Sequence, residues 1–168
     1  MRPEIWTLIS TAFGALVAIL TTMLAAKSSS NNQEKIQKFK IDSDFRLFQQ
    51  NNFLDLQDKI SNTMRLIGKI HNEDLEYFKT YNTWSNDELK EELNEKVSVS
   101  FRELNILTER VEDGEFRTKL KDLTTEMAEC LLAKTKVDAT RRIFKLMNNC
   151  DKLLEELGNL LRGYYKAQ

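Results

Sequence analysis

Arg65 and His71 are the two residues whose types and spacing could do chemistry. His71 is the single histidine of the chain and lies six positions after Arg65 in the stretch RLIGKIH. A histidine can give and take protons near neutral pH, and an arginine can hold a phosphate group with its planar guanidinium. The pair is therefore the candidate catalytic site, with the histidine as its acid–base group.

This spacing resembles the motif of HEPN-type helical ribonucleases, in which a dimer brings two Arg–His motifs together. Leu66 departs from the family pattern, which commonly has a polar residue after the arginine. On a straight helix the two side chains would also point about 120° apart. The alternative interpretation is a helix-end histidine near a surface arginine, with no catalysis.

Other reactive groups are sparse in the chain. It has 25 basic and 26 acidic residues among 168, a balance that argues against holding nucleic acid by general electrostatics and leaves a local basic patch open. Cys130 and Cys150 have no metal-type spacing, so we predict buried free thiols. No metal ion or other cofactor is expected.

The amino-terminal stretch from Ile5 to Ala26 contains no charged residue. As a helix it would be about 33 Å long, which matches the hydrocarbon core of a bilayer. It is longer than the apolar region of a signal peptide, so we predict a retained transmembrane helix over residues 5–26. One arginine precedes the span, whereas four lysines follow it, at positions 27, 35, 38 and 40. The positive-inside rule then places the amino terminus outside and the body in the cytoplasm.

One side of this predicted helix consists of small and hydroxylated residues. Such a face lets helix backbones approach closely and lets hydroxyl groups bond across an interface. We therefore predict transmembrane packing between copies, or the lining of a pore, through Thr7, Ser10, Thr11, Gly14, Ala18, Thr21 and Thr22.

The remainder of the chain predicts an all-α body, because it lacks proline after residue 3 and its apolar residues recur at helical spacing. Residues 27–40 form a polar junction, with Ser30 and Gln33 at capping-box spacing, or begin one long helix. Residues 41–168 are expected to form an antiparallel four- or five-helix bundle. Its first expected segments are a helix over 41–71, an aromatic segment over 75–84, and a helix opened by the capping box at 85–88 that ends before a turn at 113–114. A further helix begins at residue 116 and ends at 131 or at 137, and the last helix covers 143–164.

One amino-terminal span, a helical cytoplasmic body of this size and the Arg65–His71 motif together resemble the small membrane accessory proteins of type VI-B CRISPR systems. The resemblance implies an antiphage accessory in a bacterial inner membrane. It also implies assembly into a ring, with an RNA-guided, RNA-cutting nuclease as the partner.

Three functions compete on this sequence. The favoured one is a homo-oligomeric membrane protein that forms a pore or perturbs the lipid bilayer, with further copies of itself as the partner. The second is a membrane-tethered helical scaffold or adaptor that binds a cytoplasmic partner. The third is a HEPN-like ribonuclease acting through Arg65 and His71; whether the chain is an enzyme stays open, and the residues favour a protein that is not one.

Overall fold

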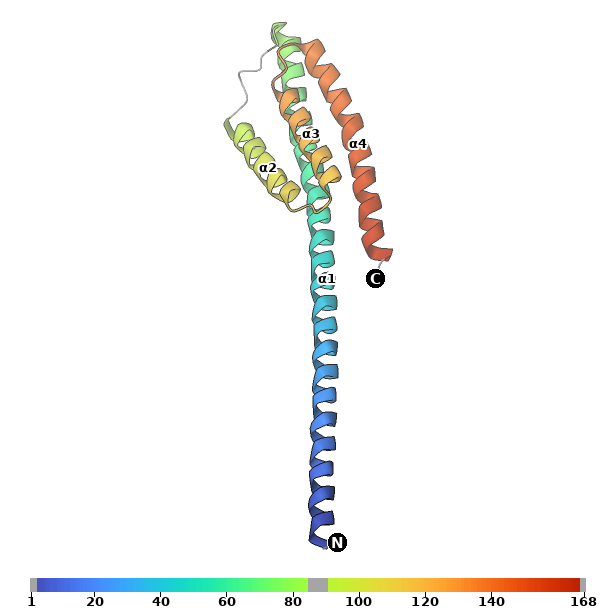
Figure 1. Cartoon of the computed structure of the whole chain (residues 1–168). Coiled ribbons are helices and arrows are strands. Elements are labelled where there is room, and N and C mark those ends of the chain that lie inside the picture. Colours follow the sequence, from blue (N-terminus) through green and yellow to red (C-terminus); the bar gives the residue numbers. More distant parts are fainter. Residues whose placement is uncertain (1–2, 85–90, 167–168) are drawn as a thin grey trace. The chain divides into compact units, whose positions relative to one another are not determined.

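The computed structural model describes residues 3–84 and 91–166, and within them the chain is all-α (Figure 1). Its four helices are α1 (Pro3–Tyr81), α2 (Glu91–Glu109), α3 (Gly114–Leu131) and α4 (Lys136–Lys166). The chain divides into two compact units, unit 1 (Met1–Phe45) and unit 2 (Arg46–Gln168). The boundary between the units falls within α1.

Unit 2 is an antiparallel four-helix bundle, as the spacing of the apolar residues predicts. The carboxyl-terminal part of α1 runs beside α2, α3 and α4, and successive helices alternate in direction (Figure 1). Each helix turns one apolar stripe inward, so the four stripes bury one another. The core is formed by large side chains from all four helices, chiefly Phe53, Leu56, Ile60, Ile67, Leu104, Phe116, Leu120, Met127, Leu146 and Leu157.

The helix α1 continues through two positions at which the sequence favours or allows a break. The polar residues 28–33 lie inside the helix, so they begin no new one. The predicted end near His71 is wrong, because α1 runs on to Tyr81. It ends where Asn82 adopts a φ of 54°, the left-handed conformation that asparagine tolerates at the end of a helix. The aromatic segment is therefore the last part of α1 together with the turn that follows.

The turn between α2 and α3 lies where the Asp113–Gly114 pair predicts it. The Asp113 carboxylate caps α3 by accepting hydrogen bonds from the backbone N–H groups of Glu115 at 2.9 Å and Phe116 at 3.0 Å. The buried side chain of Gln49 holds the same turn, because its Nε2 donates to the Arg110 carbonyl at 2.9 Å. A local cap and a distant side chain thus fix one corner of the bundle.

The predicted transmembrane helix over residues 5–26 is wrong for the part of the chain that the structure describes. None of its helices combines the length and the apolar character that crossing a membrane requires.

Two further predicted helix boundaries lie at the capping box Ser85–Glu88 and near Val137. The capping box at Ser85–Glu88 lies outside the described residues. Of the two ends predicted for the helix that begins at Phe116, Leu131 is confirmed and Val137 is wrong, because residues 136–142 belong to α4. There the Thr135 hydroxyl accepts a hydrogen bond from the Asp138 N–H at 3.2 Å, so the chain starts a new helix at a local cap.

Candidate functional site

Arg65 lies on the outside of α1. Its side chain is exposed, and its guanidinium donates to Oδ1 of Asn62, one turn earlier on the same helix, at 3.4 Å. The arginine of the candidate catalytic pair therefore has a local surface contact in unit 2.

His71 lies instead against the end of the bundle. Its half-buried ring is 5.9 Å from the ring of Trp84, whose indole Nε1 donates to the Ala133 carbonyl at 3.1 Å. Burial away from water lowers the pKa of His71 from its ordinary value, because desolvation penalises the charged imidazolium. The histidine is thus held by packing at the junction of α1 and the α3–α4 turn.

The side chains of Asp74 and Cys130 also line a small cavity beside His71. Burial, with a contribution from the neighbouring Glu73 charge, raises the pKa of Asp74 to about 6. The space is about 10 Å³, close to the smallest volume that holds one water molecule. Within one copy of the chain it is too small for a nucleotide, so this cavity is not a substrate site.

The structure does not bring Arg65 and His71 together in one chain. Arg65 contacts Asn62 and His71 contacts Trp84, which agrees with the angle expected for side chains six residues apart on a helix. A HEPN-like site made by two copies stays a prediction.

The predicted packing face of the amino-terminal helix is described only in part. Thr7, Ser10 and Thr11 lie outside the described side chains. Gly14, Ala18, Thr21 and Thr22 are exposed, and a Cβ placed on Gly14 would meet no atom within 4 Å. The hydroxyl of Thr22 donates to the Ala18 carbonyl at 2.7 Å, and that of Thr21 to the Val17 carbonyl at 2.9 Å. The two hydroxyl groups therefore bond within their own helix.

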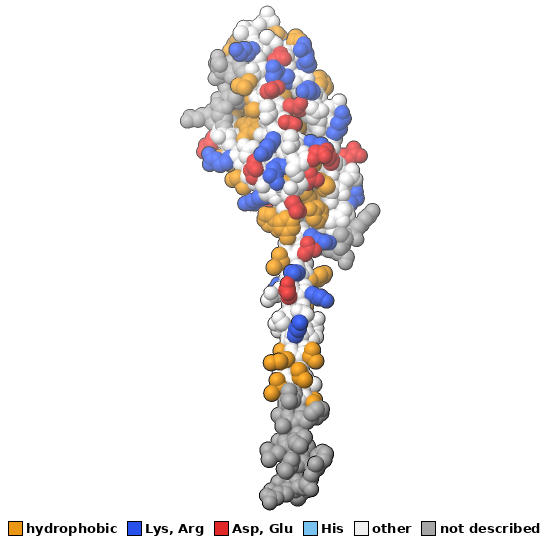
Figure 2. Space-filling model, in the orientation of Figure 1, with side chains coloured by type: hydrophobic (Ala, Val, Ile, Leu, Met, Phe, Trp, Pro, Cys, Tyr) orange, Lys and Arg blue, Asp and Glu red, His pale blue; other side chains and the backbone are white. Residues whose placement is uncertain are grey.

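Unit 1 exposes many large apolar side chains, which stand out along its helix in Figure 2. Isolated exposed apolar residues are common in proteins, whereas groups of them mark an interaction surface, and unit 1 has two such groups, at 17–24 and 36–45. Most of these side chains are at least half exposed, and Phe39 reaches 77%. The set is Val17, Ile19, Leu20, Met23, Leu24, Ile36, Phe39, Ile41 and Phe45. We call it the apolar series of unit 1.

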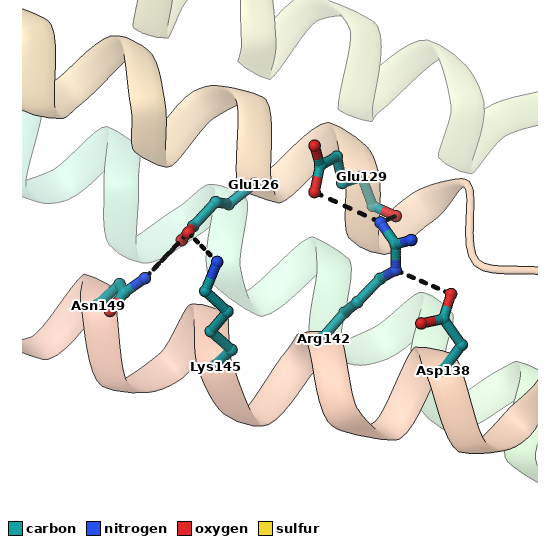
Figure 3. A network of polar contacts seen from close by, with 6 residues as sticks. All are labelled: Glu126, Glu129, Asp138, Arg142, Lys145 and Asn149. Atoms are coloured by element: carbon teal, nitrogen blue, oxygen red, sulfur yellow. Dashed lines mark hydrogen bonds and ion pairs between the residues drawn. The ribbon is translucent and has the colours of Figure 1, made fainter.

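A polar network joins α3 to α4 on the surface of the bundle (Figure 3). Glu126 accepts hydrogen bonds from Asn149 at 2.7 Å and pairs with Lys145 at 2.7 Å. Burial alone would raise the pKa of Glu126, but these bonds outweigh it and hold the pKa below its ordinary value. Arg142 bridges Asp138 on its own helix, at 2.8 Å, and Glu129 on α3, at 3.4 Å. We interpret this network as a structural contact that holds α3 against α4.

Acidic and basic side chains are intermixed on the face of the bundle seen in Figure 2. No group of three or more histidine, cysteine or acidic residues that could hold a metal ion occurs among the described residues. Both cysteines are free; Cys150 is buried as predicted, and Cys130 is only half-buried. Burial raises the pKa of both thiols to about 11, which keeps them protonated and poorly reactive.

The outward face of α4 is a candidate interaction surface that the sequence did not lead us to predict. It carries exposed apolar side chains of its own, among them Val137, Phe144 and Met147. The sequence does contain a sign of this surface, because a second series of apolar residues repeats at heptad spacing on the same helix, on a different side from the buried series. Periodicity shows both series and does not tell which one the bundle covers.

Comparisons with protein-family models, with curated proteins and with solved structures found no match for this chain. The resemblance to type VI-B CRISPR accessory proteins, and the nuclease partner and inner-membrane location that it implies, therefore stay predictions.

Proposed function

We propose that this chain is a self-associating helical scaffold, in which the apolar series of unit 1 packs against the same region of further copies. The bundle of unit 2 would then be presented several times on one assembly. The observation that carries the proposal is the exposure of this apolar series on the single helical segment that forms the described part of unit 1.

The first support is the stability of the helix itself. Most helical stability in proteins comes from packing an apolar face, and propensity alone rarely maintains a long helix in water. Within unit 1 there is no second helix on which Ile36, Phe39 and Ile41 could pack. Their exposed fractions of 67%, 77% and 69% indicate a surface that needs a partner.

The second support is the small side of the same helix. Gly14 and Ala18 are exposed, and the space around Gly14 is open, so another helix could approach the backbone closely there. Close approach increases the dispersion contacts between two helices. A further copy of the chain is a suitable partner, because it carries the same small side and the same apolar series.

The test measures the mass of the full-length chain in solution by light scattering during gel filtration. The wild type is expected to be an oligomer whose mass falls on dilution. A double variant, Phe39→Ser with Ile41→Ser, should lower the mass of the assembly, because it removes two of the most exposed apolar side chains of unit 1.

The matched control is Leu132→Ser, which removes an apolar side chain that is 70% exposed in unit 2. It should leave the oligomer mass unchanged. A wild-type chain that is monomeric at all concentrations overturns the proposal, and so does a Phe39→Ser, Ile41→Ser variant with the oligomer mass of the wild type.

A further inference from the structure

The helix α4 carries two apolar series at heptad spacing, and the bundle covers only one of them. The inner series contains Leu146, Cys150, Leu153 and Leu157, all buried in the core. The second series, which we call the outer seam, consists of Val137, Phe144, Met147, Leu154 and Tyr165. A helix buried on one side alone normally shows charged and polar residues on the other.

The outer seam is exposed to solvent except at Leu154, which is half-buried and packs against the edge of the core. The exposed fractions are 69% for Val137, 67% for Phe144 and 50% for Met147, and Tyr165 at the far end is 56% exposed. The seam extends over about 42 Å of helix, or four heptads, which is long enough for a stable helix pair.

We propose that the outer seam of α4 binds the outer seam of a second copy of this chain, with the two helices antiparallel about a twofold axis near Asn148. This interface lies within unit 2 and goes beyond the proposed packing of unit 1. In this arrangement Phe144 of each copy lies next to Leu154 of the other. The contact is isologous, so it closes as a pair.

Charge along α4 favours this occupant and this direction. Arg141 and Glu155 lie seven residues before and seven residues after Asn148, and both are exposed. No hydrogen bond or ion pair of either side chain is found among the residues that the structure describes. An antiparallel pair places Arg141 opposite Glu155 of the second copy, twice by symmetry. A parallel pair in register would keep Arg141 about 21 Å along the helix axis from Glu155 of the second copy, too far for an ion pair.

Two further residues fit a helix–helix contact of this kind. Asp151 interrupts the outer seam near the axis, and a single polar residue in such a seam specifies register at some cost in affinity. Gly158 lies on the same side, and the nearest atom to a Cβ built there belongs to the flexible end of Arg162, at 3.7 Å. A neighbouring helix can therefore approach α4 closely at this point.

The first experiment places single cysteines on the full-length chain and adds a short bis-maleimide cross-linker. Asn148→Cys should give a cross-linked dimer, because the axis brings this position next to its own copy. Ala128→Cys, exposed on α3, is the matched control and should not. Arg141→Cys and Glu155→Cys should each cross-link weakly alone and efficiently when mixed. Failure of Asn148→Cys to exceed the control overturns the proposal, as does efficient cross-linking of Arg141→Cys alone, which indicates parallel helices.

The second experiment reverses the charges and measures the dissociation constant of the pair by sedimentation. It is made in the background of Phe39→Ser with Ile41→Ser, so that packing of unit 1 does not contribute. Arg141→Glu should weaken the pair about tenfold, and adding Glu155→Arg should restore it. Equal affinity in all three chains overturns the proposal. Because all three chains share this background, a difference in affinity between them reports the α4 interface, whether or not the proposed function is correct.

Discussion

The hydroxyl groups of Thr63 and Ser100 share a hydrogen bond of 2.6 Å between α1 and α2, and both side chains are buried. Thr63 also donates to the Lys59 carbonyl at 2.7 Å. Because a hydroxyl has a single proton to give, Ser100 is the donor in the shared bond. The contact joins two helices at a polar point within an otherwise apolar interface.

Replacing Thr63 with valine should therefore destabilise unit 2. The change leaves the Ser100 hydroxyl without its acceptor in a buried position, and we expect a loss of about 1–3 kcal/mol in the free energy of unfolding. The measurement is chemical denaturation followed by circular dichroism. The control is the double variant Thr63→Val, Ser100→Ala, which should lose less than the sum of the two single changes. Strict additivity would show that the two hydroxyl groups are not coupled.

Replacing Asp113 with alanine should remove the amino-terminal cap of α3. Its carboxylate accepts from two backbone N–H groups at the first turn, and losing a cap of this type costs about 1 kcal/mol. Thermal unfolding of the full chain should show a lower midpoint. Asp113→Asn keeps an acceptor oxygen at the same position and should stay within a few tenths of a kcal/mol of the wild type. Equal midpoints for the alanine and wild-type chains would contradict a capping role.

The stability of unit 2 should depend on pH through Asp74. Its pKa is raised to about 6 in the folded chain, so between about pH 4 and 6 the folded state holds a proton that the unfolded state has released. The stability contributed by Asp74 is therefore complete below about pH 4 and is lost as the pH rises through 6. His71 acts oppositely, because its pKa is lowered and the unfolded state takes up the proton first.

A comparison of variants separates these two residues. The Asp74→Asn variant lacks the Asp74 titration, so between pH 4 and 6 its stability should change with pH only through His71. At pH 7 this variant should be more stable than the wild type. Glu73→Gln removes the smaller cause and should lower the pKa of Asp74 only partly. Unfolding curves measured at a series of pH values test this, and parallel curves for Asp74→Asn and the wild type would contradict it.

The two native cysteines should react slowly with thiol reagents while the chain is folded. Burial raises the pKa of Cys130 and Cys150 to about 11, so little thiolate is present at pH 8. Mass spectrometry after a timed exposure should find both thiols largely unlabelled, and unfolding in guanidinium should release both. A Cys150 that labels as fast in the folded chain as in the unfolded chain would show that the core is open at α4.

The sequence alone was sufficient to predict the helical class and the bundle because the signals are local. Apolar spacing of three and four marks the inner face of every helix, and the Asp113–Gly114 pair marks a turn with its own cap. The prediction of a transmembrane helix over residues 5–26 was wrong for the described residues, because no helix among them combines the length and the apolar character that crossing a membrane requires. Residue type and spacing made Arg65 and His71 candidate catalytic residues, but they did not predict which side chains each residue contacts.

The tertiary structure decided what no local pattern contains, namely which apolar face has a partner. Phe45 and Phe48 continue the series that buries Phe53 and Leu56, yet they are 41% and 45% exposed. On α4 two series repeat at the same spacing, and only the position of the other helices makes one of them core and leaves the other as a surface. Helical periodicity is a property of one segment, whereas burial is a property of the segments that surround it.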